Sequence, residues 1–171
     1  MEKAITAKSK ATKAERISIG ITEENLKNVS KLLQTCLADL HVLYLKTRNF
    51  HWNVEGENFG PLHELFEKQY KQLESIIDEV AERIRNLGFF AVGSLQGFAE
   101  LATIDEHMEE RTDAKEMLRI LASDHESHIR FLRDAIEKID EEYEDVGTAD
   151  FLTDNLRAHE KIAWMLRVHL K

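Results

Sequence analysis

Residues 50–67 read FHWNVEGENFGPLHELFE, and residues 78–83 read DEVAER. Apolar residues recur through and between these stretches at intervals of three and four, the spacing that places side chains on one face of a helix. They are Leu62, Phe66, Tyr70, Leu73, Ile77, Val80 and Ile84. The spacing predicts a helix over about 61–87, in which Pro61 is allowed in the first turn and Gly88 ends the helix.

Histidine and carboxylate side chains flank this apolar face in two pairs. His63 and Glu67 are one helical turn apart, and so are Asp78 and Glu82. Each pair can converge on one metal ion, and imidazole together with carboxylate suits iron. One helix cannot close such a site, because residues 63 and 82 are about 28 Å apart at the usual helical rise. Two copies running antiparallel across a two-fold axis near residue 72 or 73 would bring the pairs together, so we expect ligands from two subunits.

The whole motif resembles that of a known family. The pattern His-Trp-Asn-x-x-Gly-x-x-Phe-x-x-x-His over 51–63, followed by Asp-x-x-x-Glu-Arg over 78–83, is similar to that of the Dps family, the DNA-binding proteins from starved cells. The resemblance extends from about Leu26 to Leu166. It implies a ferritin-like subunit, twelve of which form a hollow shell. Such a shell oxidises Fe(II), with hydrogen peroxide as the preferred oxidant over dioxygen, and stores a ferric mineral core.

The resemblance also implies a dinuclear iron site at a dimer interface. Its catalytic and metal-binding residues would be His51, His63 and Glu67 of one subunit with Asp78 and Glu82 of its neighbour. Many family members carry aspartate at the position of Glu67, so its longer side chain could ligate iron directly or through water. Ferritin-like proteins with a site inside one bundle need Glu-x-x-His on two helices, and this chain contains no such motif, which disfavours ferritin, bacterioferritin and rubrerythrin.

The remaining pattern predicts an all-α, ferritin-like four-helix bundle. Besides the helix over 61–87, helices are expected from the N-cap Thr22, over about 112–142, and from about Thr148. Residues 89–108 have an irregular pattern and are long enough to cross the bundle between the second and third helices. This crossover is expected to hold a short helix around 95–101.

Composition indicates one soluble domain. The chain has 171 residues, of which 43% are apolar and 32% charged, enough to bury one core. The single Cys36 lies in an apolar run and reads as a small buried hydrophobe. No apolar run approaches the ~18 residues of a membrane span, and the N-terminus lacks the apolar core of a signal peptide. We therefore expect a cytoplasmic protein without a membrane partner.

Charge is distributed unevenly along the chain, whose formal net charge is −9. Residues 1–16 carry a net charge of +3, and the remainder carries −12. We expect a flexible basic tail over 1–20 and the bundle domain over 21–171. The basic residues of the tail, which could bind DNA phosphates non-specifically, are Lys3, Lys8, Lys10, Lys13 and Arg16. Twelve tails on one shell would multiply a weak affinity. The alternative is a solvated tail without a partner.

Two classes of function follow. The first is a ferroxidase and iron store that protects DNA from oxidative damage. The second is a DNA-compacting shell in which the metal chemistry is secondary or lost. A weaker third interpretation is a structural zinc or manganese protein, since the same ligands could hold those ions.

Two further groups of residues are candidates for metal binding. Asp145, Asp150 and Asp154, near the start of the last helix, resemble the segment that lines an acidic channel for iron in related shells. For Asp150, stabilisation of a helix N-terminus is the alternative. A second group is His125, His128 and His159, which lie on apolar stripes. They read as hydrogen-bonded core residues or, alternatively, as a second metal site.

Overall fold

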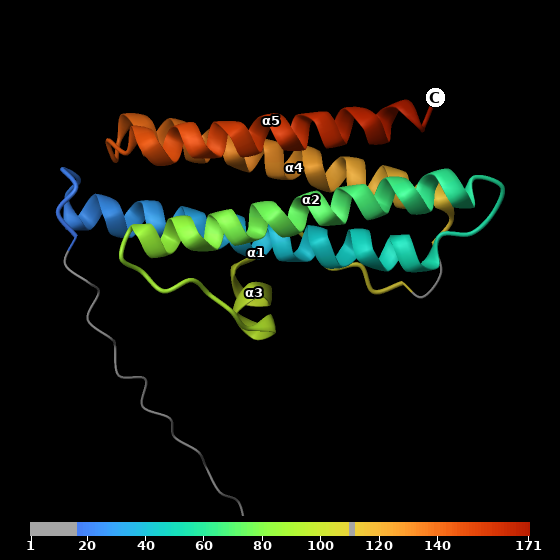
Figure 1. Ribbon diagram of the computed structural model, residues 1–171, viewed down its shortest axis with the longest axis horizontal. Coiled ribbons are helices and arrows are strands. Elements are labelled where there is room, and N and C mark those ends of the chain that lie inside the picture. Colours follow the sequence, from blue (N-terminus) through green and yellow to red (C-terminus); the bar gives the residue numbers. More distant parts are fainter. Residues whose placement is uncertain (1–16, 110–111) are drawn as a thin grey trace, which may run out of the picture.

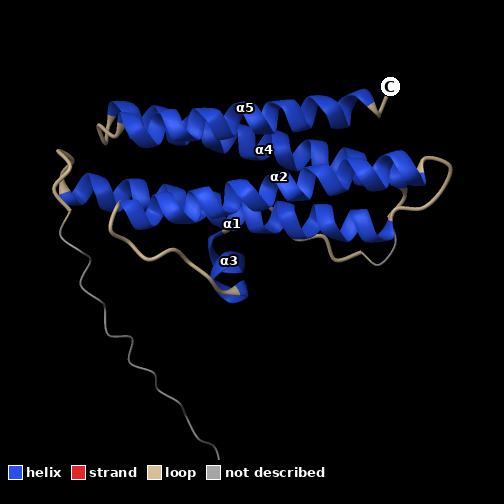
Figure 2. Ribbon diagram, viewed as in Figure 1, coloured by secondary structure: helices blue, strands red, loops and turns tan. Residues whose placement is uncertain are grey.

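The computed structural model describes residues 17–109 and 112–171, and Figures 1 and 2 show their arrangement. Four long helices form the bundle, and a short one lies outside it. They are α1 (Glu23–Asn53), α2 (Phe59–Asn86), α3 (Leu95–Leu101), α4 (Ala114–Glu141) and α5 (Val146–Val168). No strand occurs within the described ranges. The predicted all-α four-helix bundle is confirmed.

The helices pack as two antiparallel hairpins. A short loop joins α1 to α2, and another joins α4 to α5. After α2, residues 87–109 run along the outside of α1 and carry α3, as Figure 1 shows in green to yellow. This is the predicted crossover, and its short helix occupies the predicted residues. A long connection between the second and third long helices is one of the topologies that four-helix bundles adopt.

Local capping explains where the helices begin and end. The Thr22 hydroxyl accepts a hydrogen bond from the Asn25 backbone N–H at 3.1 Å, so the predicted N-cap is confirmed. Helix α2 begins at Phe59, two residues before the predicted start, and Pro61 fits its first turn because the N–H groups there have no helical partner. Gly88 ends α2 in the left-handed region, with φ of 86°.

Two apolar clusters fill the bundle. One gathers residues such as Leu33, Leu73, Ile84, Leu132 and Leu152, and the other gathers Phe50, Phe66, Leu121, Ile162 and Leu166. On each long helix, buried polar residues fall between the positions that belong to the two clusters. These residues are Lys46 and Thr47 on α1, Gln69 on α2, His125 and His128 on α4, and His159 on α5. A polar layer therefore divides the core.

Candidate metal centre

Two histidines fix each other where α1 turns into α2. Nδ1 of His51 lies 2.9 Å from the backbone carbonyl oxygen of His63, and Nδ1 of His63 lies 2.8 Å from that of His51. The rings stack with their centroids 3.8 Å apart. A carbonyl oxygen only accepts hydrogen bonds, so each Nδ1 must carry the proton. In the neutral ring this leaves a lone pair on each Nε2, which is the form that binds metal ions.

Aromatic neighbours complete the setting of the histidine pair. The Tyr70 ring meets His51 edge-on at a centroid distance of 5.3 Å, and the Phe59 ring lies 5.1 Å from His63. His51 retains 9% of its surface exposed. The loop between the helices thus positions two imidazoles at the end of the α1–α2 hairpin without using the atoms that would ligate a metal.

Glu67 follows His63 by one turn of α2 and is partly exposed. The Lys71 ammonium donates a hydrogen bond of 2.6 Å to its Oε1. This bond and the charge of Lys71 lower the pKa of Glu67, and the nearby His51 and His63 lower it further. Glu67 is therefore an ionised carboxylate at neutral pH, with one oxygen held by a cation.

Asp78 and Glu82 are exposed on α2 and lie far along the helix from the histidine pair. The rise of a helix separates residues 63 and 82 by about 28 Å. Within residues 17–109 and 112–171 of a single subunit, no three His, Cys, Asp or Glu side chains converge as a metal site would require. One subunit thus brings His51 and His63 together and leaves Asp78 and Glu82 apart from them.

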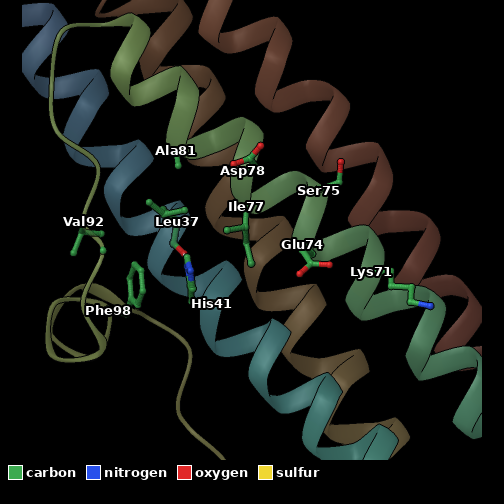
Figure 3. Close-up of a pocket in the computed structure, with 11 residues that line it drawn as sticks. Leu37, His41, Lys71, Glu74, Ser75, Ile77, Asp78, Ala81, Val92 and Phe98 are labelled. Atoms are coloured by element: carbon green, nitrogen blue, oxygen red, sulfur yellow. The ribbon is translucent and has the colours of Figure 1, made fainter.

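A cleft of about 680 Å³ lies beside the same part of α2 (Figure 3). Leu37 and His41 of α1 form one wall, and Phe98 of α3 stacks on the His41 ring at a centroid distance of 3.7 Å. The side chains of α2 that line the cleft include Lys71, Glu74, Ser75 and Asp78. The carboxylate-bearing face of α2 is therefore open in one subunit.

The acidic residues near the start of α5 differ in their surroundings. Asp145 is the N-cap of α5 and is only 3% exposed, and it accepts hydrogen bonds from the Thr148 backbone N–H at 3.0 Å and from Arg83 at 3.2 Å. Asp150 and Asp154 are exposed, and Asp154 pairs with Arg157. Asp145 thus caps a helix inside the subunit, whereas the other two carboxylates face solvent.

The buried histidines of the polar layer bond to one another and to α1. Nδ1 of His125 lies 2.9 Å from Nδ1 of His159. The His128 ring lies between Asp39, 3.5 Å from its Nδ1, and the Cys36 sulfur, 3.8 Å from its Nε2. Burial lowers the pKa of His125 to about 3 and that of His159 well below its ordinary value, and the charge of His128 lowers both further. These contacts favour the expected core role.

Sequence reasoning missed Asp39, which is fully buried. Its Oδ1 accepts hydrogen bonds from the backbone N–H groups of Thr103 and Ile104, at 2.5 and 3.1 Å, and its Oδ2 accepts one from the Thr103 hydroxyl at 2.8 Å. Asp39 therefore ties the crossover to α1. A charged residue within the apolar run of a core helix was the available signal. Cys36 is buried, as predicted, and burial raises the pKa of its thiol.

Some predictions concern residues outside the described ranges. The candidate DNA-binding residues Lys3, Lys8, Lys10, Lys13 and Arg16 all lie there, so their role stays a prediction. Among the helices that the structure describes, none combines the length and apolarity needed to cross a membrane.

Comparisons with known proteins identify the family of this chain. A family model described as a ferritin-like domain matches residues 30–171. An uncharacterised low temperature-induced protein of Nostoc is 47% identical, with 89% of this chain and 85% of the relative covered. DNA protection during starvation protein 2 of Bacillus anthracis is 37% identical, with 84% and 97% covered.

Solved structures give the same result. DpsC from Streptomyces coelicolor superposes with a TM-score of 0.89 at 31% identity, covering 92% of each chain. The Dps protein of Vibrio cholerae superposes with a TM-score of 0.86 at 32% identity, covering 94% of this chain and all of the other. That protein is described as a member of a broad superfamily of ferritin-like diiron-carboxylate proteins. This chain therefore belongs to the Dps family of ferritin-like proteins.

Proposed function

We propose that this protein oxidises Fe²⁺ at a dinuclear site shared by two subunits and stores the product as a ferric mineral inside a closed shell. The observation that carries the proposal is the histidine pair. His51 and His63 each use Nδ1 to bind the other's backbone, which leaves both Nε2 atoms available. Iron is the substrate and cargo, and imidazole with carboxylates suits it.

The second half of the site comes from a partner in this proposal. Asp78 and Glu82 stand as far from the centre of α2 as Glu67 and His63 do on the other side. An antiparallel α2 from a second copy would therefore place Asp78 and Glu82 of the partner subunit beside the histidine pair, twice per dimer. The open carboxylate-bearing face of α2 supports this arrangement.

The chemistry follows from the ligand types. Hard carboxylates such as Glu67 stabilise Fe³⁺ more than Fe²⁺, so oxidation is favoured where they converge. Two Fe²⁺ ions, one hydrogen peroxide and two protons yield two Fe³⁺ ions and two water molecules. Because two irons supply one electron each, the peroxide is fully reduced and no hydroxyl radical is released. Dioxygen is the alternative oxidant.

The shell belongs to the same proposal. We take twelve subunits, built from two-fold dimers, as its composition and the cytoplasm as its location. Asp150 and Asp154 are the solvent-facing candidates for the channel through which Fe²⁺ enters. Asp145 is the weakest of the three candidates, because its carboxylate already caps α5 and binds Arg83.

The proposal is tested by adding peroxide to protein loaded anaerobically with Fe²⁺ and following ferric absorbance. Wild type should oxidise iron rapidly and keep it soluble, and His63→Ala/Glu82→Ala should lose this activity. A matched control is His169→Ala/Glu141→Ala, which removes one histidine and one glutamate that are exposed and lie outside α2. Equal rates in the wild type and the His63→Ala/Glu82→Ala variant would contradict the proposal and favour a zinc, manganese or DNA-binding role.

A second activity, non-specific DNA binding by the tail, is supported by the charge contrast between residues 1–16 and the remaining chain. The relative from Bacillus anthracis is itself named for DNA protection. A gel-shift assay at several salt concentrations should show DNA binding by the full chain and loss of binding when residues 1–16 are removed. Unchanged binding after truncation would refute a role for the tail.

A further inference from the structure

A stripe of six polar residues follows α2 along its open side. The members are spaced by four, four, three, four and four positions: His63, Glu67, Lys71, Glu74, Asp78 and Glu82. At 3.6 residues per turn they occupy a sector of about 100° on the helix surface. The stripe is symmetric about the point between residues 72 and 73, because the first member mirrors the last, the second the fifth, and the third the fourth.

This symmetry determines what meets at the two-fold axis of the proposed dimer. The outer members form the two iron sites: in each, His63 and Glu67 of one subunit lie beside Asp78 and Glu82 of the partner subunit. The inner members meet as Lys71 opposite Glu74 of the partner subunit, and Glu74 opposite Lys71 of the partner subunit. A self-complementary surface needs such reciprocal pairs of opposite charge. Figure 3 shows Lys71, Glu74 and Asp78 projecting from α2 beside the cleft.

In a single subunit, Lys71 has a different partner. Its ammonium lies 2.6 Å from Oε1 of Glu67, one turn away. An ammonium on this oxygen competes with any metal ion for the same carboxylate. Glu74 is exposed, and its contact with the Tyr44 hydroxyl is long, at 3.5 Å, so it retains capacity to accept a stronger hydrogen bond.

We propose that Lys71 is a positioning residue that exchanges partners when two subunits associate. It holds Glu67 in the single subunit and Glu74 of the partner subunit in the dimer. The exchange releases Glu67 to bind Fe²⁺ only where the partner also supplies the missing carboxylates. Lys71 thereby couples ligand availability to assembly. This inference rests on the proposed function, because it requires the shared iron site.

The test is anaerobic calorimetric titration of the assembled protein with Fe²⁺ at low ionic strength. Glu74→Gln removes the charge that receives Lys71, so Lys71 should stay on Glu67. Exposed ion pairs are weak, so Fe²⁺ affinity should fall about twofold, and about fivefold at most. The double variant Lys71→Met/Glu74→Gln should recover wild-type affinity, a rescue that a merely structural role would not produce. Lys71→Met alone should bind Fe²⁺ at least as tightly as wild type.

Three controls keep the outcomes separate. Glu116→Gln removes a carboxylate from a similarly exposed ion pair with Arg119 on α4 and should change nothing. Sedimentation checks that every variant assembles alike. His63→Ala/Glu82→Ala reports on the iron site itself, and if it binds Fe²⁺ normally, the proposed function fails. If that variant loses binding, the proposed function stands, and any one of three results refutes the exchange alone. These results are wild-type binding by Glu74→Gln, no rescue in the double variant, and weaker binding by Lys71→Met.

Discussion

His125 and His159 meet at the centre of the bundle with their Nδ1 atoms 2.9 Å apart, and neither ring is exposed. One Nδ1 must donate and the other accept, so the pair is compatible with neutral rings. Both Nε2 atoms are buried without a hydrogen-bond partner. Charging either ring would place an uncompensated cation in the core, which is the physical reason that burial lowers the pKa of both histidines.

Acid should therefore destabilise the bundle through this pair. The folded-state pKa of His125, about 3, lies below the ordinary value of 6.5, so the unfolded chain binds more protons as the pH falls below 6.5. Above that pH, the contribution of the two neutral rings to the free energy of unfolding is fully present. It declines towards pH 3, by at most about 1.4 kcal/mol per pH unit for each histidine. Urea unfolding between pH 7.5 and 4.5 measures the decline. His125→Leu/His159→Leu should flatten it, whereas His169→Gln, at an exposed position, should not.

In the histidine pair of the candidate metal centre, Nδ1 holds the fold and Nε2 is left for a metal, so the two roles can be tested separately. His63→Asn keeps a side-chain N–H near the position of Nδ1, so the bond to the His51 carbonyl can survive, but it removes Nε2. We expect a melting temperature close to that of the wild type and a fall in Fe²⁺ oxidation of about 10- to 100-fold. Thermal unfolding and peroxide-dependent ferric absorbance check the two parts. Wild-type oxidation by His63→Asn would show that His63 is not a ligand.

Asp145 should matter for stability. Asp145→Ala removes the N-cap of α5 and leaves Arg83 without its buried partner. The cap contributes about 0.5–2 kcal/mol, and loss of the charged hydrogen bond adds to it. Urea unfolding should therefore show a loss of about 1–3 kcal/mol. A stability unchanged from wild type would contradict the capping role.

The exposed carboxylates of α5 should matter for uptake instead. Asp150→Asn/Asp154→Asn is expected to slow mineral formation from added Fe²⁺ without changing the urea midpoint appreciably, because exposed carboxylates attract cations yet contribute little to folding. Stopped-flow absorbance at low and high ionic strength measures the effect, which salt should diminish. Uptake equal to that of wild type at low salt would exclude both residues from the channel.

Spacing along the chain was enough to predict the helices. The apolar face from Leu62 to Ile84 predicted α2 to within two residues at its start, and Thr22 predicted the start of α1, because both signals are local. Contacts between distant segments were not predictable in this way. Asp39 binds the crossover 64 residues away, and the mutual bonds of His51 and His63 depend on how the loop closes.

Lys71 illustrates a different limit. Its pairing with Glu67, one turn away, can be read from the sequence. Whether Lys71 can also reach a partner subunit depends on which face of α2 stays open. Only the packed bundle identifies that face, because α1 and α3 border it without covering it. Asp145 is similar, since its burial against Arg83 of another helix removes it from the solvent-facing acidic group.

The central claim is that each iron site draws ligands from two subunits, and complementation between two inactive variants tests it most directly. His63→Ala and Glu82→Ala subunits are produced together, co-assembled and assayed for peroxide-dependent Fe²⁺ oxidation. Random pairing makes half of the dimers mixed, and each mixed dimer holds one intact site, so about a quarter of the wild-type activity should return. If the mixture stays as inactive as either variant alone, the ligands belong to one subunit and the account is wrong.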